Sequence, residues 1–239
     1  MPSTLTSTGI TFSDGNSQNT AAGGGVVKKR VELYDSNATH TIASGTNHLE
    51  IHAIGGGSRN APGNSGGGAG GGYAFALINK STSIPNVNSF AVNIGAGGVN
   101  QNQNASNQAG ATSVGGYVVA NGGNAANRTT NAGSGGNGGT GSVNFSSPID
   151  SFTGTGGNGG GGNWNATGSG INGNKPNPFG GGGGPKIGTT SGIGADGTYP
   201  LPAIVENSQA NVTPGLKAGQ GGGSRGGDGL VVIIEYGDD

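Results

Sequence analysis

The chain has 239 residues, of which 58 are glycine and 10 are proline, while only 9% are charged and the net charge is −1. Such a charge balance provides neither the basic face that nucleic-acid binding requires nor an acidic tail. The sequence has no cysteine, which excludes disulfide bonds and thiolate metal sites.

The glycines are concentrated in dense runs separated by more varied sequence. This composition is typical of low-complexity chains, but disorder normally also requires strong charge repulsion, which is missing here. The apolar residues are grouped in short alternating segments. We therefore expect an ordered and unusually polar fold, with glycine-dense runs at residues 66–72, 133–141, 156–162, 180–184 and 219–229.

Residues 1–25 differ from the rest and are expected to form a separate N-terminal segment with a hinge. Ile10 and Phe12 alternate with polar residues as in a short strand, and Asp14-Gly15 is a turn signal. Two apolar side chains cannot bury a core, so this segment must pack on copies of itself or on another protein. Three consecutive glycines at residues 23–25 follow as the hinge.

Residues 26–239 are expected to form one all-β domain with a glycine-rich middle part, like a β-sandwich that carries long loops. No window of twelve residues has a helical apolar period free of glycine and proline, so we expect essentially no helix. The last strand should be central, because Val232 and Ile234 lie on one face and Val231 and Ile233 on the other. The expected strands are residues 26–34, 39–43, 49–54, 73–78, 90–94, 117–120 and 230–236.

The three histidines are His40, His48 and His52. The spacing of His48 and His52 imitates a helical metal pair, but the flanking residues alternate as in a strand. Residues four apart on a strand lie ~13 Å apart, too far to share an ion. We therefore interpret them as surface histidines on a half-buried strand, and expect neither a metal nor a cofactor.

The run from Gly133 to Gly141 repeats glycine with a period of three. A polyproline-II helix has three residues per turn, so glycine would line its edges and let neighbouring backbones approach closely. This pattern predicts several polyglycine-II rods packed side by side. Ordered loops or a flexible linker are the alternatives.

Signals for enzymatic chemistry are weak. Gly133-x-Gly135-x-x-Gly138 matches the dinucleotide-binding fingerprint, but it lacks a preceding buried strand, a following helix and a suitably spaced acidic residue. No phosphate-binding Gly-Lys-Ser/Thr motif occurs, and no serine stands in a strand–turn–helix context. We expect that the protein is not an enzyme.

Aromatic and asparagine-rich loops lie between the glycine runs, at residues 100–108, 145–152, 163–179 and 199–214. A rigid scaffold that presents such loops has the layout of a recognition surface. The alternative is that the aromatic rings cap the ends of the rods against water. The candidate receptor-binding residues are Asn163, Trp164, Asn165, Phe145, Phe152, Phe179 and Tyr199.

Two parts of the chain resemble bacteriophage tail-fibre proteins. Residues 5–18 (LTSTGITFSDGNSQ) resemble a segment that recurs in tail fibres, especially those of marine phages. The remainder, from about Thr41, resembles the glycine-rich domain of phage tail fibres in the ordered series 49–54 (LEIHAI), 66–74 (GGGAGGGYA), 92–98 (VNIGAGG) and 226–236 (GGDGLVVIIEY). It is also similar in style to the tip adhesins of certain T-even phages.

This resemblance implies a virion protein, assembled in the host cytoplasm and acting outside the cell as a homotrimer. The N-terminal segment, with Ile10, Phe12 and Asp14, would attach to other tail proteins. The loops would bind a bacterial surface receptor, either a glycan or an outer-membrane protein, without contact to nucleic acid and without membrane insertion. Two other functions stay open: a structural virion component, such as a tail connector or decoration protein, and an ice-binding polyglycine-II protein.

Overall fold

A computed structural model describes residues 27–59, 68–98, 109–124, 136–156, 158 and 226–237, together with short strands elsewhere in the chain. Two five-stranded antiparallel sheets pack face to face around a common core. The predicted all-β class is therefore confirmed. The described helix α1 (Lys80–Ser83) is a single turn, and no helix in the described residues is long and apolar enough to span a membrane.

The first sheet has the order β13-β7-β6-β17-β4, and each strand runs antiparallel to its neighbours. The C-terminal strand is therefore central, as predicted. The bounds are β4 (Val27–Tyr34), β6 (Thr46–Ile54), β7 (Tyr73–Asn79), β13 (Asp150–Gly154) and β17 (Leu230–Gly237).

The second sheet has the order β12-β10-β9-β8-β5 and is also antiparallel throughout. Its β9–β10 turn uses Gly115 and Gly116, both with positive φ, and Tyr117 N–H closes it by donating to the Val114 carbonyl at 3.0 Å. The bounds are β5 (Ala38–Thr41), β8 (Ser89–Asn93), β9 (Thr112–Val114), β10 (Val118–Ala120) and β12 (Gly141–Val143).

Further short strands lie outside the sandwich. β1 (Thr4–Thr6), β2 (Gly9–Thr11) and β3 (Ser17–Gln18) form a small antiparallel sheet, so the predicted strand at Ile10 is confirmed. Phe12 and Asp14 lie outside the described residues. The pairs β11 (Ala132–Gly133) with β14 (Gly162–Asn163), and β15 (Lys186–Ile187) with β16 (Thr190–Ser191), are also antiparallel.

Both faces of β17 are buried, as its alternation predicts. Val231 and Ile233 belong to the core between the two sheets. Val232 and Ile234 point to the other face and pack in a second cluster with Tyr73. A strand buried on both faces contributes apolar surface to two clusters at once, and β17 is such an interior strand between β6 and β4.

The prediction of surface histidines is wrong for two of the three. The exposed fraction is 0% for His40 and 3% for His52. Each is compensated by polar partners: His40 Nδ1 lies 2.9 Å from Tyr34 Oη, and His52 Nδ1 lies 2.7 Å from Tyr73 Oη. Burial of a polar imidazole costs little free energy when its nitrogens have such hydrogen-bond partners. The alternation of residues along a strand does not reveal which partners the fold will bring together.

Within the sandwich, the sequence patterns missed three short strands: β9, β12 and β13. Part of the loop expected at residues 145–152 is strand, because β13 pairs with β7 in the register Phe152 opposite Phe75. The polar sequence of β13 fits an edge strand whose residues 150–153 are exposed. Apolar alternation, the signal used to predict strands, is weak in such a segment.

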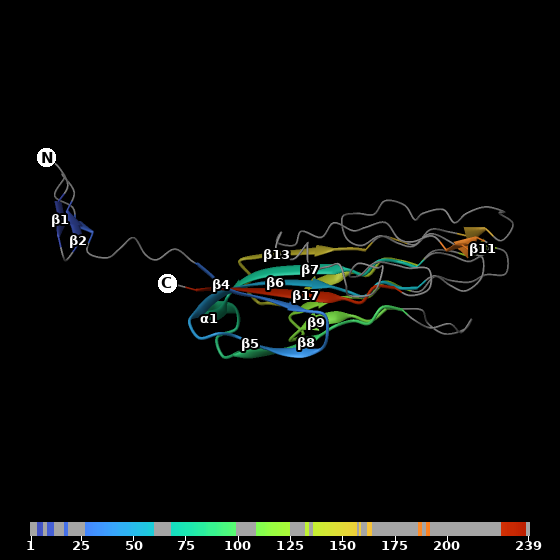
Figure 1. The fold of residues 1–239 in the computed structure, drawn as a ribbon, viewed down its shortest axis with the longest axis horizontal. Helices are drawn as coiled ribbons and strands as arrows, with labels where there is room; N and C mark the ends of the chain where they lie inside the picture. Colours follow the sequence, from blue (N-terminus) through green and yellow to red (C-terminus); the bar gives the residue numbers. More distant parts are fainter. Residues whose placement is uncertain are drawn as a thin grey trace.

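The strands of the sandwich continue at one end into a bundle of glycine-rich segments (Figure 1). We call these segments the glycine bundle. They have no strand or helix hydrogen-bond pattern of their own, yet most of their residues are buried. The glycine bundle comprises residues 55–58, 68–72, 94–98, 109–111, 121–124, 136–140, 155–156 and 226–229.

Backbone hydrogen bonds in the glycine bundle follow a period of three. Gly55 N–H donates to Gly72 at 2.9 Å and Ser58 N–H donates to Ala69 at 2.8 Å, so residues three apart reach the same neighbouring segment. Between them, Gly56 donates to Gly110 and Gly57 to Gly227, in two other segments. A segment whose successive donors point in three directions is a three-fold polyproline-II-type helix. The predicted polyglycine-II packing is the arrangement that these bonds describe.

Glycine occupies most of the buried positions of these segments, together with small residues such as Ser58 and Ala69, and the exposed positions carry residues larger than glycine. A Cβ on Gly71 would overlap the backbone of Gly55, and one on Gly138 would overlap that of Gly156. The central segment 55–58 is buried at every position, whereas Asn121 and Asn124 in another segment are exposed three residues apart. Removal of side chains from the contact sides therefore lets the backbones bond directly to each other.

Candidate functional site

The glycine bundle is made of chain that leaves the sandwich and returns to it. Residues 55–58 continue β6 outward and residues 68–72 lead back into β7; β8 and β9, β10 and β12, and β13 and β17 are joined in the same way. In all four cases the described chain stops at the end of the bundle remote from the sandwich. The intervening stretches, residues 60–67, 99–108, 125–135 and 157–225, thus begin and end at this one place. We call it the bundle end.

Most predicted site residues belong to the stretch 157–225. Asn163 lies on β14, where its backbone pairs with Ala132 of β11. The pairing joins this stretch to the stretch 125–135, which starts from a different pair of bundle segments. The other candidates of the stretch lie outside the described residues: Trp164, Asn165, Phe179 and Tyr199.

Two predicted site residues belong to the sandwich instead. Phe145 is 8% exposed and stacks on Tyr117 with ring centroids 4.8 Å apart, so its ring contributes mainly to packing. Phe152 is 49% exposed on the edge strand β13, with its ring centroid 6.3 Å from that of Tyr73. These two rings therefore lie on the scaffold that precedes the bundle, apart from the bundle end.

A cavity of about 240 Å³ opens on the flank of the bundle between residues 109–111, 121–124 and 136–140. Its side-chain lining is uncharged: Asn121 Nδ2 donates to Thr140 Oγ1 at 3.1 Å, and Asn124 lies beside them. Amides and hydroxyls of this kind can donate to and accept from a hydroxyl-rich ligand. The sequence signal for this cavity is the spacing of Asn121-Gly-Gly-Asn124, since two polar residues three apart lie on the same side of a three-fold helix.

A buried carboxylate lies at the opposite end of the sandwich, near the ends of β4 and β17. Glu235 is fully buried; its Oε2 accepts from Ala43 N–H at 2.9 Å and from Thr46 Oγ1 at 2.5 Å, and its Oε1 pairs with the Arg30 guanidinium. Burial alone would raise the pKa of Glu235, but these hydrogen bonds and the guanidinium together lower it. The carboxylate therefore stays charged and joins β17 to β4 and β6.

His40 faces this carboxylate from the second sheet. Its Nε2 lies 3.0 Å from Glu235 Oε1, without the alignment of a hydrogen bond, and its ring stacks on Phe90. Burial lowers the pKa of His40, and only part of that effect is offset by the charge of Glu235. His40 is therefore a neutral member of a cluster that fixes one sheet against the other, and it has no exposed surface for a substrate.

A second polar network lies on the outer face of the first sheet. His52 Nε2 lies 2.7 Å from Glu50 Oε1, and Tyr236 Oη donates to Glu50 Oε2 at 2.6 Å. The hydrogen bond from His52 lowers the pKa of Glu50, and burial raises the pKa of Tyr236 to about 12. These side chains and Tyr73 are hydrogen-bonded to one another. Such a mutually bonded network stabilises the fold.

The comparison with known families agrees with this architecture. A family described as the glycine-rich domain matches residues 32–236. The chain belongs to this family. The match includes the strands from β5 to β16, β17 as far as Tyr236 and the whole glycine bundle. It leaves the three-stranded N-terminal sheet outside the glycine-rich domain. No curated protein matches the chain.

Proposed function

We propose that this protein is a bacteriophage tail fibre or tip adhesin, whose glycine-rich domain binds a receptor on the bacterial surface. The main support is the topology of the glycine bundle. Four stretches of chain, one of them 157–225, start and finish at the bundle end. In many receptor-binding proteins, loops held by a rigid scaffold carry the binding residues.

The chemistry of the scaffold also favours binding over catalysis. The buried titratable groups are paired with each other at the opposite end of the sandwich or on its outer face. The flank cavity between Asn121 and Thr140 offers uncharged hydrogen-bonding groups, which suit hydroxyl-rich surface glycans. The bundle itself would supply a stiff stem, since most of its segments bond to at least two neighbouring segments.

The proposed partners follow from the same reasoning. The bundle end would face the host, and Trp164, Phe179 and Tyr199 belong to the sequence between the bundle segments 155–156 and 226–229. The N-terminal sheet, which lies outside the matched family region, would attach to other tail proteins. We further propose a homotrimer, located in the virion, because the N-terminal segment resembles that of trimeric tail fibres.

The test is binding of the fluorescently labelled full chain to intact cells of the bacterium that the parent phage infects. The mass in solution is determined on the same sample. Saturable binding by a trimer, competed by unlabelled protein, is the expected result. The matched control is Ile149→Ala, which removes an exposed apolar side chain of the sandwich, and which should bind as well as the parent chain.

A well-folded chain that does not bind these cells, and that copurifies with tail proteins, would overturn the adhesin proposal. That result would identify a structural virion component instead. Thermal hysteresis of ice growth without any association with virions would overturn both.

A further inference from the structure

The flank cavity is an unfilled position in the packing of the glycine bundle. A three-fold helix points its backbone N–H and C=O groups in roughly six directions, so a fully surrounded segment bonds to as many neighbours. Segment 121–124 bonds through its backbone to four others: 136–140, 68–72, 55–58 and 109–111. These four are bonded to one another in that order, so they enclose the segment on one side, and the flank cavity lies on the other.

The backbone N–H of Gly122 is directed toward this unfilled position. On either side of it, Asn121 N–H donates to the Thr140 carbonyl at 2.7 Å and Gly123 N–H donates to the Gly56 carbonyl at 2.8 Å. In a three-fold helix the N–H between these two points in the third direction. Gly122 is buried and lines the cavity, and its N–H has no hydrogen-bond partner among the described residues. A buried N–H of this kind costs free energy unless water or a ligand accepts from it.

Three polar side chains line the same space. Asn121 and Asn124 are exposed and three residues apart, so both project from one side of their segment. Asn121 Nδ2 donates to Thr140 Oγ1 at 3.1 Å, which leaves Asn121 Oδ1 and the Thr140 hydroxyl hydrogen for a ligand. The amide of Asn124 adds a further donor and acceptor. Donors and acceptors from two neighbouring segments therefore face one cavity.

These side chains exclude another glycine segment as the occupant. Segments of the bundle meet where side chains are absent: a Cβ on Gly122 would overlap the Ala109 carbonyl, and one on Gly139 would overlap the Asn121 carbonyl. On the cavity side, the amides of Asn121 and Asn124 project into the space that a further backbone would need. The described lining also has no charged side chain, which disfavours an ionic ligand.

An uncharged sugar ring meets these conditions. Each sugar hydroxyl donates and accepts at once, as the amide and hydroxyl groups of the lining do. The methyl groups of Ala109 and Ala111 offer apolar contact to the C–H groups of a ring. The volume of about 240 Å³ is just below the about 300–1,000 Å³ of sites for drug-sized ligands, so the cavity suits one ring.

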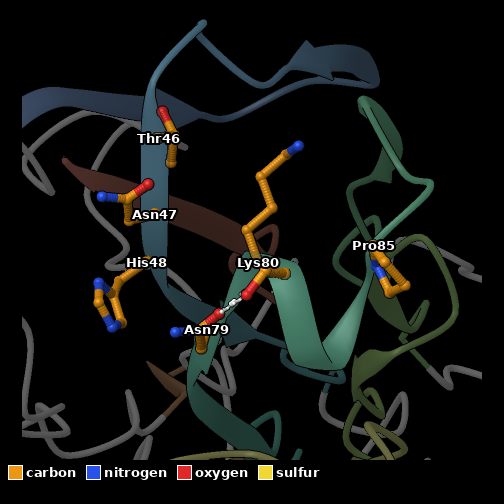
Figure 2. A pocket seen from close by; sticks show the side chains of 7 residues that line it. Thr46, Asn47, His48, Asn79, Lys80 and Pro85 are labelled. Carbon is orange, nitrogen blue, oxygen red and sulfur yellow. Dashed lines mark hydrogen bonds between the residues drawn. The ribbon is translucent and has the colours of Figure 1, made fainter.

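The larger described cavity, of about 430 Å³, lies beside α1 and does not offer this convergence. Its lining includes Asn79, His48 and Lys80. Lys80 extends away from the other two side chains (Figure 2), so the polar groups do not meet at one point. A ligand of the size of one sugar ring would find its partners in the flank cavity instead.

From these observations we infer that the flank cavity binds one uncharged sugar ring, with Gly122 N–H, Asn121, Asn124 and Thr140 as its polar contacts. Binding of a sugar follows from the geometry of the cavity alone, whereas the origin of that sugar in a glycan of the bacterial surface rests on the proposed function. The receptor would then contain a neutral sugar that the protein contacts on the side of the bundle, apart from the bundle end.

The test uses the uniformly ¹⁵N-labelled full chain and three probes, which are glucose, galactose and N-acetylglucosamine. Glycerol is the control, because it has neighbouring hydroxyls but no ring. At least one sugar is expected to bind saturably and to shift the amide resonances of Gly122, Asn124 and Thr140. For so small a ligand the Kd should be on the order of millimolar.

The double variant Asn121→Ala/Asn124→Ala should weaken sugar binding at least ~10-fold, because it removes two hydrogen-bonding side chains from the cavity. Both residues are exposed, so the resonances of the sandwich strands should stay those of the parent chain. The matched control is Asn137→Ala, which removes an exposed asparagine of the same bundle that does not line the cavity. It should leave sugar binding unchanged.

Absence of saturable shifts with all three sugars, an equal response to glycerol, or an equal loss in Asn137→Ala would overturn the inference. Cell binding separates this inference from the proposed function. A parent chain that binds a sugar but no cells contradicts the proposed function alone, and one that binds cells but no sugar contradicts the sugar site alone. Weaker cell binding by the double variant supports both, whereas unchanged cell binding would overturn the assignment of the sugar to the receptor.

Discussion

Gly226 packs so closely on Gly57 that a Cβ at residue 226 would overlap the Gly57 carbonyl group. Gly57 N–H donates to the adjacent Gly227 carbonyl at 2.8 Å, and Gly226 N–H donates to Gly98 at 3.0 Å. The C-terminal segment thus enters the centre of the bundle through the backbone of its glycines, and Asp228 adds a side-chain oxygen that accepts from Gly97 N–H at 2.7 Å. This packing requires glycine at residue 226, because a Cβ there would clash with backbone atoms of Gly57, which cannot rotate away as a side chain could.

Gly226→Ala is therefore expected to destabilise the protein by at least about 3 kcal/mol, at the upper end of what overpacking costs. The unfolding temperature should fall by roughly 6–12 °C for a chain of this size, measured by circular dichroism. The control is Ala96→Ser, which enlarges an exposed side chain of the same bundle. Equal stability of Gly226→Ala and the parent chain would contradict the close packing.

Glu235→Gln is expected to destabilise the protein by roughly 2–3 kcal/mol, because it removes the buried carboxylate that pairs with Arg30 and accepts from Ala43 N–H and Thr46 Oγ1. Glu32→Gln is the matched control, since Glu32 lies 3.5 Å from the same guanidinium but is about one-third exposed. Exposed pairs contribute about 0–1 kcal/mol. Chemical unfolding measures both, and an equal effect of the two substitutions would show that burial of Glu235 is unimportant.

Acidification should destabilise the fold in two stages. The ordinary pKa is 6.5 for His40 and 4.5 for Glu235, and both are lowered in the folded state. The unfolded chain therefore binds more protons, so stability is lost as the pH falls below about 6.5, and further below about 4.5. The groups that face His40 are Glu235, Arg30, Glu32 and Tyr34.

The unfolding temperature between pH 8 and pH 4 measures this dependence. His40→Gln should remove the first stage and keep the second. A first stage of unchanged size in His40→Gln would assign it to another group.

Trp164→Ala is expected to reduce binding to host cells at least ~10-fold, as loss of a central aromatic anchor does at interfaces. The unfolding temperature should stay that of the parent chain. Ile149→Ala, on the sandwich, should change neither property. Retained cell binding in Trp164→Ala would remove this tryptophan from the receptor site, without affecting the other loop residues.

Much of the fold could be predicted from sequence because the long strands carry clear apolar alternation. β17 is the best case: its two apolar faces correctly indicated a central strand. β9 and β12 have three residues each, too few to establish a period. The period of three in residues 133–141 indicated polyglycine-II packing, and residues 136–140 take part in it, whereas Gly133 lies on β11. The central segment 55–58 gave no such signal, because its role depends on neighbours that are remote in sequence.

The polar clusters could not be predicted for the same reason. Arg30 and Glu235 are separated by 205 residues, and only the pairing of β4 with β17 brings them together. Sequence patterns placed His40 on a strand but predicted that it lies at the surface, and they indicated no role for Arg30 or Glu235. Nothing local distinguishes a glutamate that will be fully buried from one that faces solvent.

The glycine bundle has a consequence for how stability depends on temperature. Its contacts bury peptide groups rather than hydrocarbon, and exposing peptide groups on unfolding lowers the heat capacity, whereas exposing apolar surface raises it. The heat-capacity change per residue should therefore be smaller than the usual ~12–15 cal/mol/K. A smaller value flattens the stability curve, so that the free energy of unfolding varies little between cold and warm water.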